Sequence, residues 1–340
     1  MRVVFRADAS VSIGSGHVMR CLTLAGALAQ RGAQAAFLCC PQPGDMRAAI
    51  EAHGFPVIPL QRCDDSREAA SALEAMGEVG WLVVDHYGID ERWERAMRSA
   101  VHRIFAIDDL ADRRHDCDLL LDQNLRSEET SYRGLVPPSA TVLMGPSYAL
   151  LRDEFRQART RVSVREGKVR RIVVFFGGSD PTNETEKAVA AIRLLNRADI
   201  EVDVIVGASN PVKDRISDLC AELPYMRFHC QVADMAHFLE EADLALGAAG
   251  VSSWERLALG VPALVVAVAD NQLENMRQLD KLGAAIGLGV SRNVTVEGLA
   301  QAIGNLLSSP GIVRAMSEKT LGLVDGEGAN RVLRQMEAMR

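Results

Sequence analysis

Short apolar runs alternate with amphipathic stretches along nearly the whole chain of 340 residues, and this alternation limits the possible folds more than any other feature. Between two such runs, residues 16 to 31 carry apolar side chains every three or four positions and stop at Gly32, which predicts a helix. This strand–helix–strand order is typical of a parallel sheet with helices on both faces. Strands are expected at 2–6, 34–39, 56–59, 80–84, 103–107, 118–121, 171–176, 202–206, 226–229, 243–247, 263–268 and 284–287.

The alternation is interrupted once, by a charged segment between Leu150 and Lys168. A chain of this length suits two domains of about 150 residues each, so we predict two Rossmann-like open parallel-sheet α/β domains facing each other across a cleft. The predicted parts are a first domain at 1–150, a connection at 151–168, a second domain at 169–310 and a helical segment at 311–340 that could pack back on the first domain. Ligands of such sheets bind beyond the carboxyl ends of the strands.

Composition narrows the classes of function. The longest strongly apolar stretch, Val261 to Ala269, is far shorter than the roughly 20 residues of a membrane helix, and MRVVFRADAS lacks the apolar core of a signal peptide. Seven cysteines without a C-x-x-C pattern predict reduced thiols in a cytoplasmic protein. A net charge of −7 without a basic stripe argues against broad nucleic-acid binding. We expect no membrane partner, and a monomer is favoured.

The first expected strand leads into Ile-Gly-Ser-Gly-His, residues 13–17, at the start of a helix. Gly14 and Gly16 permit close approach of the backbone to a ligand. The partial positive charge of the helix end should lower the pKa of His17, leaving a neutral imidazole that can act as a general base. Arg20 lies on the same helix face, where it could contact a ligand or form an ordinary surface ion pair with Asp8.

Two turns in the second half resemble nucleotide-binding loops. Strand 171–176 runs into GGSDPTN, and a helix is expected to begin near Pro181. The backbone N–H groups of this loop can face a phosphate, although helix capping would also explain the sequence. No Walker lysine follows it. The strand at 243–247 runs into GAAGVSSWE, in which Glu255 can accept hydrogen bonds from ribose hydroxyls or simply stabilise the helix dipole. The candidate nucleotide-binding residues are Gly178, Ser179, Asp180, Asn183, Ser253 and Glu255.

Polar residues also follow four other strands, where they could line a sugar pocket or cap helices. With Gly14, Gly16 and Arg20, the candidate sugar-binding residues are Tyr87, Asp109, Asn124, Gln272 and Asn275. No histidine, cysteine or carboxylate spacing supports a metal site. The remaining histidines that we interpret as packing or surface residues are His53, His102, His115, His229 and His237.

These motifs taken together resemble the PseG family of the GT-B superfamily, the MurG-type glycosyltransferases being similar in their loop pattern. The resemblance rests on RADASVSIGSGHVMRC, VVDHYGID, IDDL, GPSYALLRDEF, FFGGSDPTN and WERLALGVP, spread from residue 6 to about 275. Members of that family hydrolyse UDP-2,4-diacetamido-2,4,6-trideoxy-β-L-altropyranose in pseudaminic acid biosynthesis. The resemblance implies that His17 is the catalytic base and that residues 178–183, Ser253 and Glu255 bind the uridine nucleotide, and no cofactor is expected.

The hypothesis is therefore hydrolysis at the anomeric carbon of a UDP-sugar, with His17 activating water and the configuration inverted. Because UDP is a good leaving group, the carboxylic acid partner that ordinary glycosidases need is dispensable. Two alternatives remain: a glycosyltransferase in which His17 activates an acceptor hydroxyl, and a non-catalytic nucleotide-sugar sensor. UDP release in the absence of an acceptor separates the first from hydrolysis, and absence of turnover identifies the second.

Overall fold

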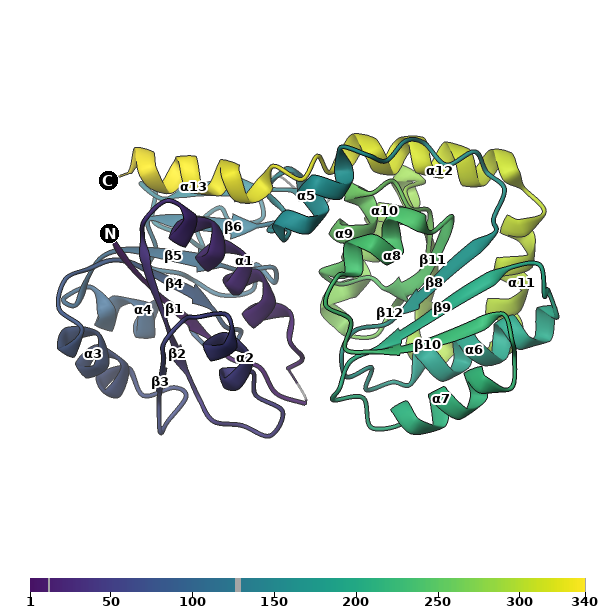
Figure 1. Cartoon of the computed structure of the whole chain (residues 1–340). Coiled ribbons are helices and arrows are strands. Elements are labelled where there is room, and N and C mark those ends of the chain that lie inside the picture. The colour runs from purple at the N-terminus through teal and green to yellow at the C-terminus, as the bar shows by residue number, and fades with distance from the viewer. Residues whose placement is uncertain (12, 126–129, 340) are drawn as a thin grey trace. The chain divides into compact units, whose positions relative to one another are not determined.

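The computed structural model describes residues 1–11, 13–125 and 130–339, so Arg340 at the end of the expected C-terminal segment lies outside it (Figure 1). The described chain forms two compact units. The first comprises residues 1–150 and 327–340, and the second comprises residues 151–326. Each is built around one parallel sheet, which confirms the predicted fold class of two parallel-sheet α/β domains.

The sheet of the first unit has the strand order β3-β2-β1-β4-β5-β6-β7, all pairs being parallel. Alternate residues of β1 point to opposite faces, with Phe5 in the core under α1 and α13 and Val4 in the core under α3 and α4. The strands are β1 (Arg2–Ala7), β2 (Gln34–Cys39), β3 (Val57–Pro59), β4 (Val79–Asp85), β5 (Val101–Ile107), β6 (Leu119–Asp122) and β7 (Thr141–Met144). The helices are α1 (Gly16–Gln30), α2 (Arg47–Ala52), α3 (Ser66–Ala75), α4 (Glu91–Met97) and α13 (Gly328–Ala338).

The sheet of the second unit has the order β10-β9-β8-β11-β12-β13, again all parallel. Its strands are β8 (Arg171–Phe175), β9 (Glu201–Val206), β10 (Met226–Cys230), β11 (Leu244–Ala248), β12 (Ala263–Ala267) and β13 (Ile286–Val290). Its helices are α5 (Asp153–Arg159), α6 (Glu184–Leu195), α7 (Lys213–Ala221), α8 (Met235–Glu241), α9 (Ser252–Ala258), α10 (Leu273–Leu282), α11 (Val296–Leu307) and α12 (Pro310–Leu323). Because all strands of each sheet are parallel, the loops after them gather at one edge.

The structure differs from the sequence-based expectation in four places. The segment 151–168, expected as a connection, belongs to the second unit and contains α5. The expected C-terminal segment is divided, since α12 belongs to the second unit and α13 packs on α1 in the first. Strand β7 was not expected, because its four residues are too short for a clear pattern. Helix α6 begins at Glu184 rather than near Pro181. None of the described helices combines the length and apolar character needed to cross a membrane.

Candidate active site

His17, in the first turn of α1, contacts Asp85, the last residue of the neighbouring strand β4. Its Nδ1 lies 2.5 Å from Oδ1 of Asp85. Arg20 holds the same carboxylate from one helical turn further on, with Nε 2.5 Å from Oδ2 and Nη2 2.6 Å from Oδ1. All three side chains are buried, the His17 residue being 7% exposed. Of the two alternatives for Arg20, the surface ion pair with Asp8 is wrong, because Arg20 is buried and pairs with Asp85.

The protonation of Asp85 decides which nitrogen of His17 is available. Burial alone would raise the pKa of Asp85, but the charge of Arg20 and the hydrogen bonds from Arg20 and His17 hold that pKa well below its usual range. An ionised carboxylate can only accept, so we assign the proton of the short contact to Nδ1 of His17. Among the described residues, Nε2 of His17 has no hydrogen-bond partner. A neutral His17 therefore presents a lone pair on Nε2, the arrangement of a general base oriented by a carboxylate.

Tyr87 and Asp109 complete this group. The Tyr87 ring meets the imidazole of His17 edge-on, with 4.5 Å between ring centroids. The Tyr87 hydroxyl donates to Asp109, and burial together with the charge of Asp109 raises the pKa of Tyr87 above its usual value, so the hydroxyl keeps its proton. Oδ2 of Asp109 lies 3.6 Å from Nη1 of Arg20. The structure thus brings together four predicted residues from the ends of three elements.

Other predicted sugar-binding residues in the first unit are less closely tied to this group. Gly14 has a φ of 80°, which favours glycine, and lies in the turn before α1, where its N–H donates to the carbonyl of Ser10. Gly16 is the first residue of α1. Asn124 donates its backbone N–H to Oδ1 of Asp122. In the described part of the chain no hydrogen bond or ion pair joins Asn124 to His17.

A second buried ion pair, between Arg6 and Asp8, lies at the end of β1, the strand that pairs with β4. Asp8 binds Arg6 at 2.8 Å, and its other oxygen is 3.3 Å from Nε2 of His86. Nδ1 of His86 accepts the Gly88 N–H, so both ring nitrogens of His86 have partners. Burial would raise the pKa of Asp8, but its hydrogen bonds from His86 and Arg6 keep the pKa well below its usual range.

Asp8 also belongs to the group of residues in the described chain that could hold a metal. Its carboxylate and the thiols of Cys40 and Cys63 offer ligand atoms within 4.8 Å of one another. The guanidinium of Arg6 donates to Asp8 and to the Cys63 carbonyl. The positive charge that the Asp8 carboxylate needs is therefore already supplied by Arg6.

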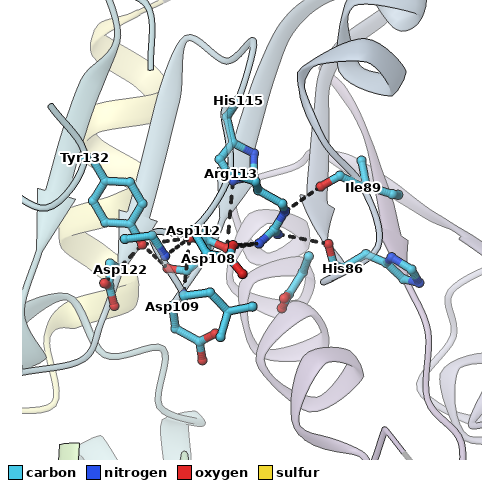
Figure 2. Close-up of polar contacts among 12 residues, drawn as sticks. His86, Ile89, Asp108, Asp109, Asp112, Arg113, His115, Asp122 and Tyr132 are labelled. Atoms are coloured by element: carbon cyan, nitrogen blue, oxygen red, sulfur yellow. Dashed lines mark hydrogen bonds and ion pairs between the residues drawn. The ribbon is translucent and has the colours of Figure 1, made fainter. Parts of the chain in front are cut away.

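The loops that carry Tyr87 and Asp109 are tied together by Arg113 (Figure 2). Its Nη1 lies 2.8 Å from Oδ1 of Asp108, while Nε and Nη2 donate to the carbonyls of Ile89 and His86. Oδ2 of Asp108 accepts the N–H of Ala111, whose φ of 52° lies in the left-handed region. The loops that carry Tyr87 and Asp109 are therefore held by the contacts of Arg113 and Asp108.

His115, interpreted from the sequence as a packing or surface residue, is buried and also has two acidic neighbours. Its Nδ1 lies 2.7 Å from Oε1 of Glu94. Its Nε2 faces Asp108, 3.8 Å from Oδ1 (Figure 2). Burial lowers the pKa of His115, but its interactions with the carboxylates of Asp108 and Glu94 outweigh burial and raise the pKa to about 9. His115 is therefore a cation at neutral pH. His229 likewise has a carboxylate partner, Asp203, at 2.8 Å.

In the second unit, the loop between β8 and α6 contains Gly178, Ser179, Asp180 and Asn183. Both carboxylate oxygens of Asp180 accept backbone N–H groups of α6, from Glu184 at 3.0 Å and from Thr185 at 2.8 Å. Asn183 has a φ of 58°, so the helix cannot begin before Glu184. Asp180 is thus a capping residue, as the alternative interpretation held. The carbonyl of Gly178 accepts the Gly207 N–H, which joins this loop to the end of β9.

The turn between β11 and α9 gathers predicted residues around it. Nδ2 of Asn275 donates to the carbonyl of Ala249 at 2.8 Å, and Oγ of Ser253 accepts from Arg256 at 3.0 Å. Glu255 lies on α9 and pairs with Arg152 at 3.2 Å. Gln272 accepts the Val268 N–H with Oε1, and its Nε2 lies 3.0 Å from where a Cβ of residue 250 would be.

Sequence reasoning missed two residues. Asp85 was considered only as a cap or as part of a sugar pocket, although the order of a doubly wound sheet places the end of β4 beside the end of β1. Arg256 was not singled out, since nothing in its helix pattern marks it as buried; it is 4% exposed.

Comparison with known proteins supports the resemblance found in the motifs. Residues 172–332 match the Glycosyltransferase family 28 C-terminal domain. The chain is 27% identical over 288 residues, 83% of this chain and 97% of the relative, to a UDP-2,4-diacetamido-2,4,6-trideoxy-beta-L-altropyranose hydrolase from Campylobacter jejuni. The predicted resemblance is confirmed.

Two further matches are a curated relative, of which the chain spans only part, and a solved structure with a similar fold. The chain is 29% identical over 59% of its length to the spore coat polysaccharide biosynthesis protein SpsG of Bacillus subtilis. It spans less than two thirds of SpsG and of one other curated relative. The crystal structure of MurG from Acinetobacter baumannii matches with a TM-score of 0.69, 17% identity and 99% coverage of both chains. That similarity concerns the fold alone, which is the two-domain GT-B architecture.

Proposed function

We propose that this chain is a UDP-sugar hydrolase and that His17 activates the attacking water. The observation that carries the proposal is the hydrogen bond of His17 Nδ1 to the buried carboxylate of Asp85, which leaves Nε2 without a partner among the described residues. The similarity to the C. jejuni hydrolase, over nearly its full length, supports the type of reaction.

In the proposed reaction, Nε2 of His17 takes a proton from water as the water oxygen bonds to the anomeric carbon. The bond between that carbon and the diphosphate oxygen breaks with its electron pair, so UDP leaves and the configuration is inverted. Asp85 stabilises the imidazolium that forms and keeps the ring in place. Arg20, Tyr87 and Asp109 are the proposed sugar-side residues, together with Gly14, Gly16 and Asn124.

The second unit is proposed to hold the nucleotide. The loop of residues 178–183 would face the diphosphate, and Ser253 and Glu255 the ribose, with Gln272 and Asn275 on the sugar side. By the name of the C. jejuni relative, the substrate proposed here is UDP-2,4-diacetamido-2,4,6-trideoxy-β-L-altropyranose. The place of the reaction would be pseudaminic acid biosynthesis in the cytoplasm, a reducing compartment that suits seven free cysteines.

A glycosyltransferase is the second candidate, favoured by the match of residues 172–332 to a glycosyltransferase domain. His17 would then remove a proton from an acceptor hydroxyl instead of water. The two reactions differ in whether an acceptor is needed for UDP release.

The test is incubation of the purified chain with this UDP-sugar and with UDP-N-acetylglucosamine, with no acceptor present. UDP release is followed by chromatography, and the configuration of the fresh product is followed by NMR. Catalytic release of UDP with an inverted product supports hydrolysis. Release only after an acceptor is added supports transfer, and binding without turnover over hours supports a sensor.

A further inference from the structure

Arg256 is a buried cation without an acidic partner. The residue is 4% exposed, and among the described residues no carboxylate lies within 4.0 Å of its guanidinium. Burial lowers the pKa of Arg256 to about 10, which still leaves the group charged at neutral pH. Burying an unpaired charge is unfavourable, so a fold that keeps one needs a reason for it.

The guanidinium holds the turn that follows β11. Nη2 donates to the carbonyl of Ala248 at 2.6 Å and to Oγ of Ser253 at 3.0 Å, and Nη1 donates to Oγ of Ser252 at 3.1 Å. All of these acceptors are neutral. The hydrogen bonds therefore fix the turn without cancelling the charge.

Gly247 makes room for the guanidinium. A Cβ at position 247 would lie 2.5 Å from Nη1 of Arg256 and 2.6 Å from the carbonyl of Phe175. Only glycine lets the group lie against the end of β11. The neighbouring Glu255 is engaged by Arg152, so its negative charge is shared with another cation.

We propose that Arg256 is a positioning residue that fixes the turn from Ala248 to Ser253 and supplies the positive charge by which this unit prefers a nucleoside diphosphate to the uncharged nucleoside. The inference rests on the proposed function, in which this unit holds the nucleotide. A charge in the low-dielectric interior is poorly screened and acts over several ångströms without touching the ligand.

A purely structural role makes a different prediction from an electrostatic one. If Arg256 only shapes the turn, its loss weakens UDP and uridine alike, because both use the same pocket. If its charge matters, loss weakens UDP far more than uridine. Lysine keeps the charge but cannot reproduce the fork of hydrogen bonds, so it separates the two effects.

The experiment measures dissociation constants of UDP by calorimetry and of uridine by NMR titration, for the whole chain and for Arg256→Gln, Arg256→Lys and Arg165→Gln. Arg165 is the matched control, because its guanidinium also donates to neutral acceptors, the carbonyls of Leu239 in α8 and of Leu259 at the C-terminal end of α9. Thermal unfolding of each variant is recorded alongside.

For Arg256→Gln we expect UDP binding to weaken about 10- to 100-fold and uridine binding less than about 3-fold. Arg256→Lys and Arg165→Gln should keep the ratio of the two affinities within about 3-fold of the unaltered chain. Equal weakening of both ligands by Arg256→Gln overturns the inference. If that variant does not fold, loss of the ratio in Arg256→Lys overturns it instead, and its retention supports it. Failure of the unaltered chain to bind UDP would contradict the proposed function rather than the role of Arg256.

Discussion

In the first unit the buried carboxylates of Asp85 and Asp8 are each paired with an arginine. In the second unit the buried guanidinium of Arg256 has only neutral acceptors in the part of the chain that the structure describes. Paired charges hold side chains in one geometry and leave little net charge. An unpaired positive charge is not neutralised within the protein, so it can attract an anionic ligand. The first unit is therefore suited to the proposed orientation of a base, and the second unit to the proposed binding of an anion.

Replacing His17 tests the role proposed for the first unit and has the largest expected effect. We expect His17→Leu to lower kcat by about 10³-fold or more, within the range for losing a general base and its orientation. The dissociation constant of UDP should stay within about 3-fold, because the nucleotide is proposed to bind to the second unit. Single-turnover kinetics and calorimetry measure the two quantities. Release of UDP at nearly the normal rate would remove His17 from the chemistry.

The next largest effect is expected from a substitution of Asp85, the carboxylate that contacts His17. Asp85→Asn keeps the shape but removes the charge, so the imidazolium loses its stabilisation and Nδ1 can receive a hydrogen bond instead of donating one. We expect kcat to fall about 10²- to 10⁴-fold. The matched control is Asp8→Asn at the end of β1, another buried carboxylate paired with an arginine, which should lower stability but change kcat less than about 10-fold. An Asp85→Asn enzyme with normal kcat would leave His17 without its proposed orienting partner.

This pair of carboxylates also shows what the sequence could and could not predict. The two sheets and the position of His17 follow from apolar runs and from a glycine turn at a helix start, which are local patterns. Contact between Asp85 and His17 depends on β4 lying beside β1, across 68 positions of sequence. Strand order is a property of the whole sheet, and only the rule for doubly wound folds brings it within reach.

In the second unit, too, the roles of individual side chains could not be predicted from local sequence patterns. Asp180 lies in a loop whose sequence fits either a phosphate site or a helix cap. Only the hydrogen bonds that its carboxylate accepts from the N–H groups of Glu184 and Thr185 show that it is used as a cap. Arg256 follows Glu255 in a pattern that an exposed helix would share. Its burial depends on Gly247, nine positions earlier, which reads as an ordinary turn residue until the packing is known.

The paired charges of the first unit should also make its stability depend on pH. The pKa of His115 is raised to about 9 from 6.5, so its contribution is complete below about pH 6.5 and is lost as pH rises through 9. We expect the free energy of unfolding to fall by on the order of 2–3 kcal/mol between pH 6 and pH 10. Urea denaturation across this range measures it. In His115→Gln the slope should be smaller, and an unchanged slope would assign the effect to other groups.

Substitutions at two glycines of the second unit have the smallest expected effects, and they test how far the position of the Arg256 guanidinium matters. Gly247→Ala places a methyl group 2.5 Å from Nη1 of Arg256 and should destabilise the unit by about 1–3 kcal/mol, as overpacking of a core does. The control is Gly322→Ala in α12, where no atom lies within 4 Å of the added Cβ. It should stabilise the chain by about 0.5–1 kcal/mol, because alanine loses less backbone entropy in a helix. Chemical denaturation gives both values. Since Gly247→Ala displaces the guanidinium without removing its charge, UDP affinity should fall less than in Arg256→Gln, and a larger fall would mean that geometry, more than charge, governs this turn.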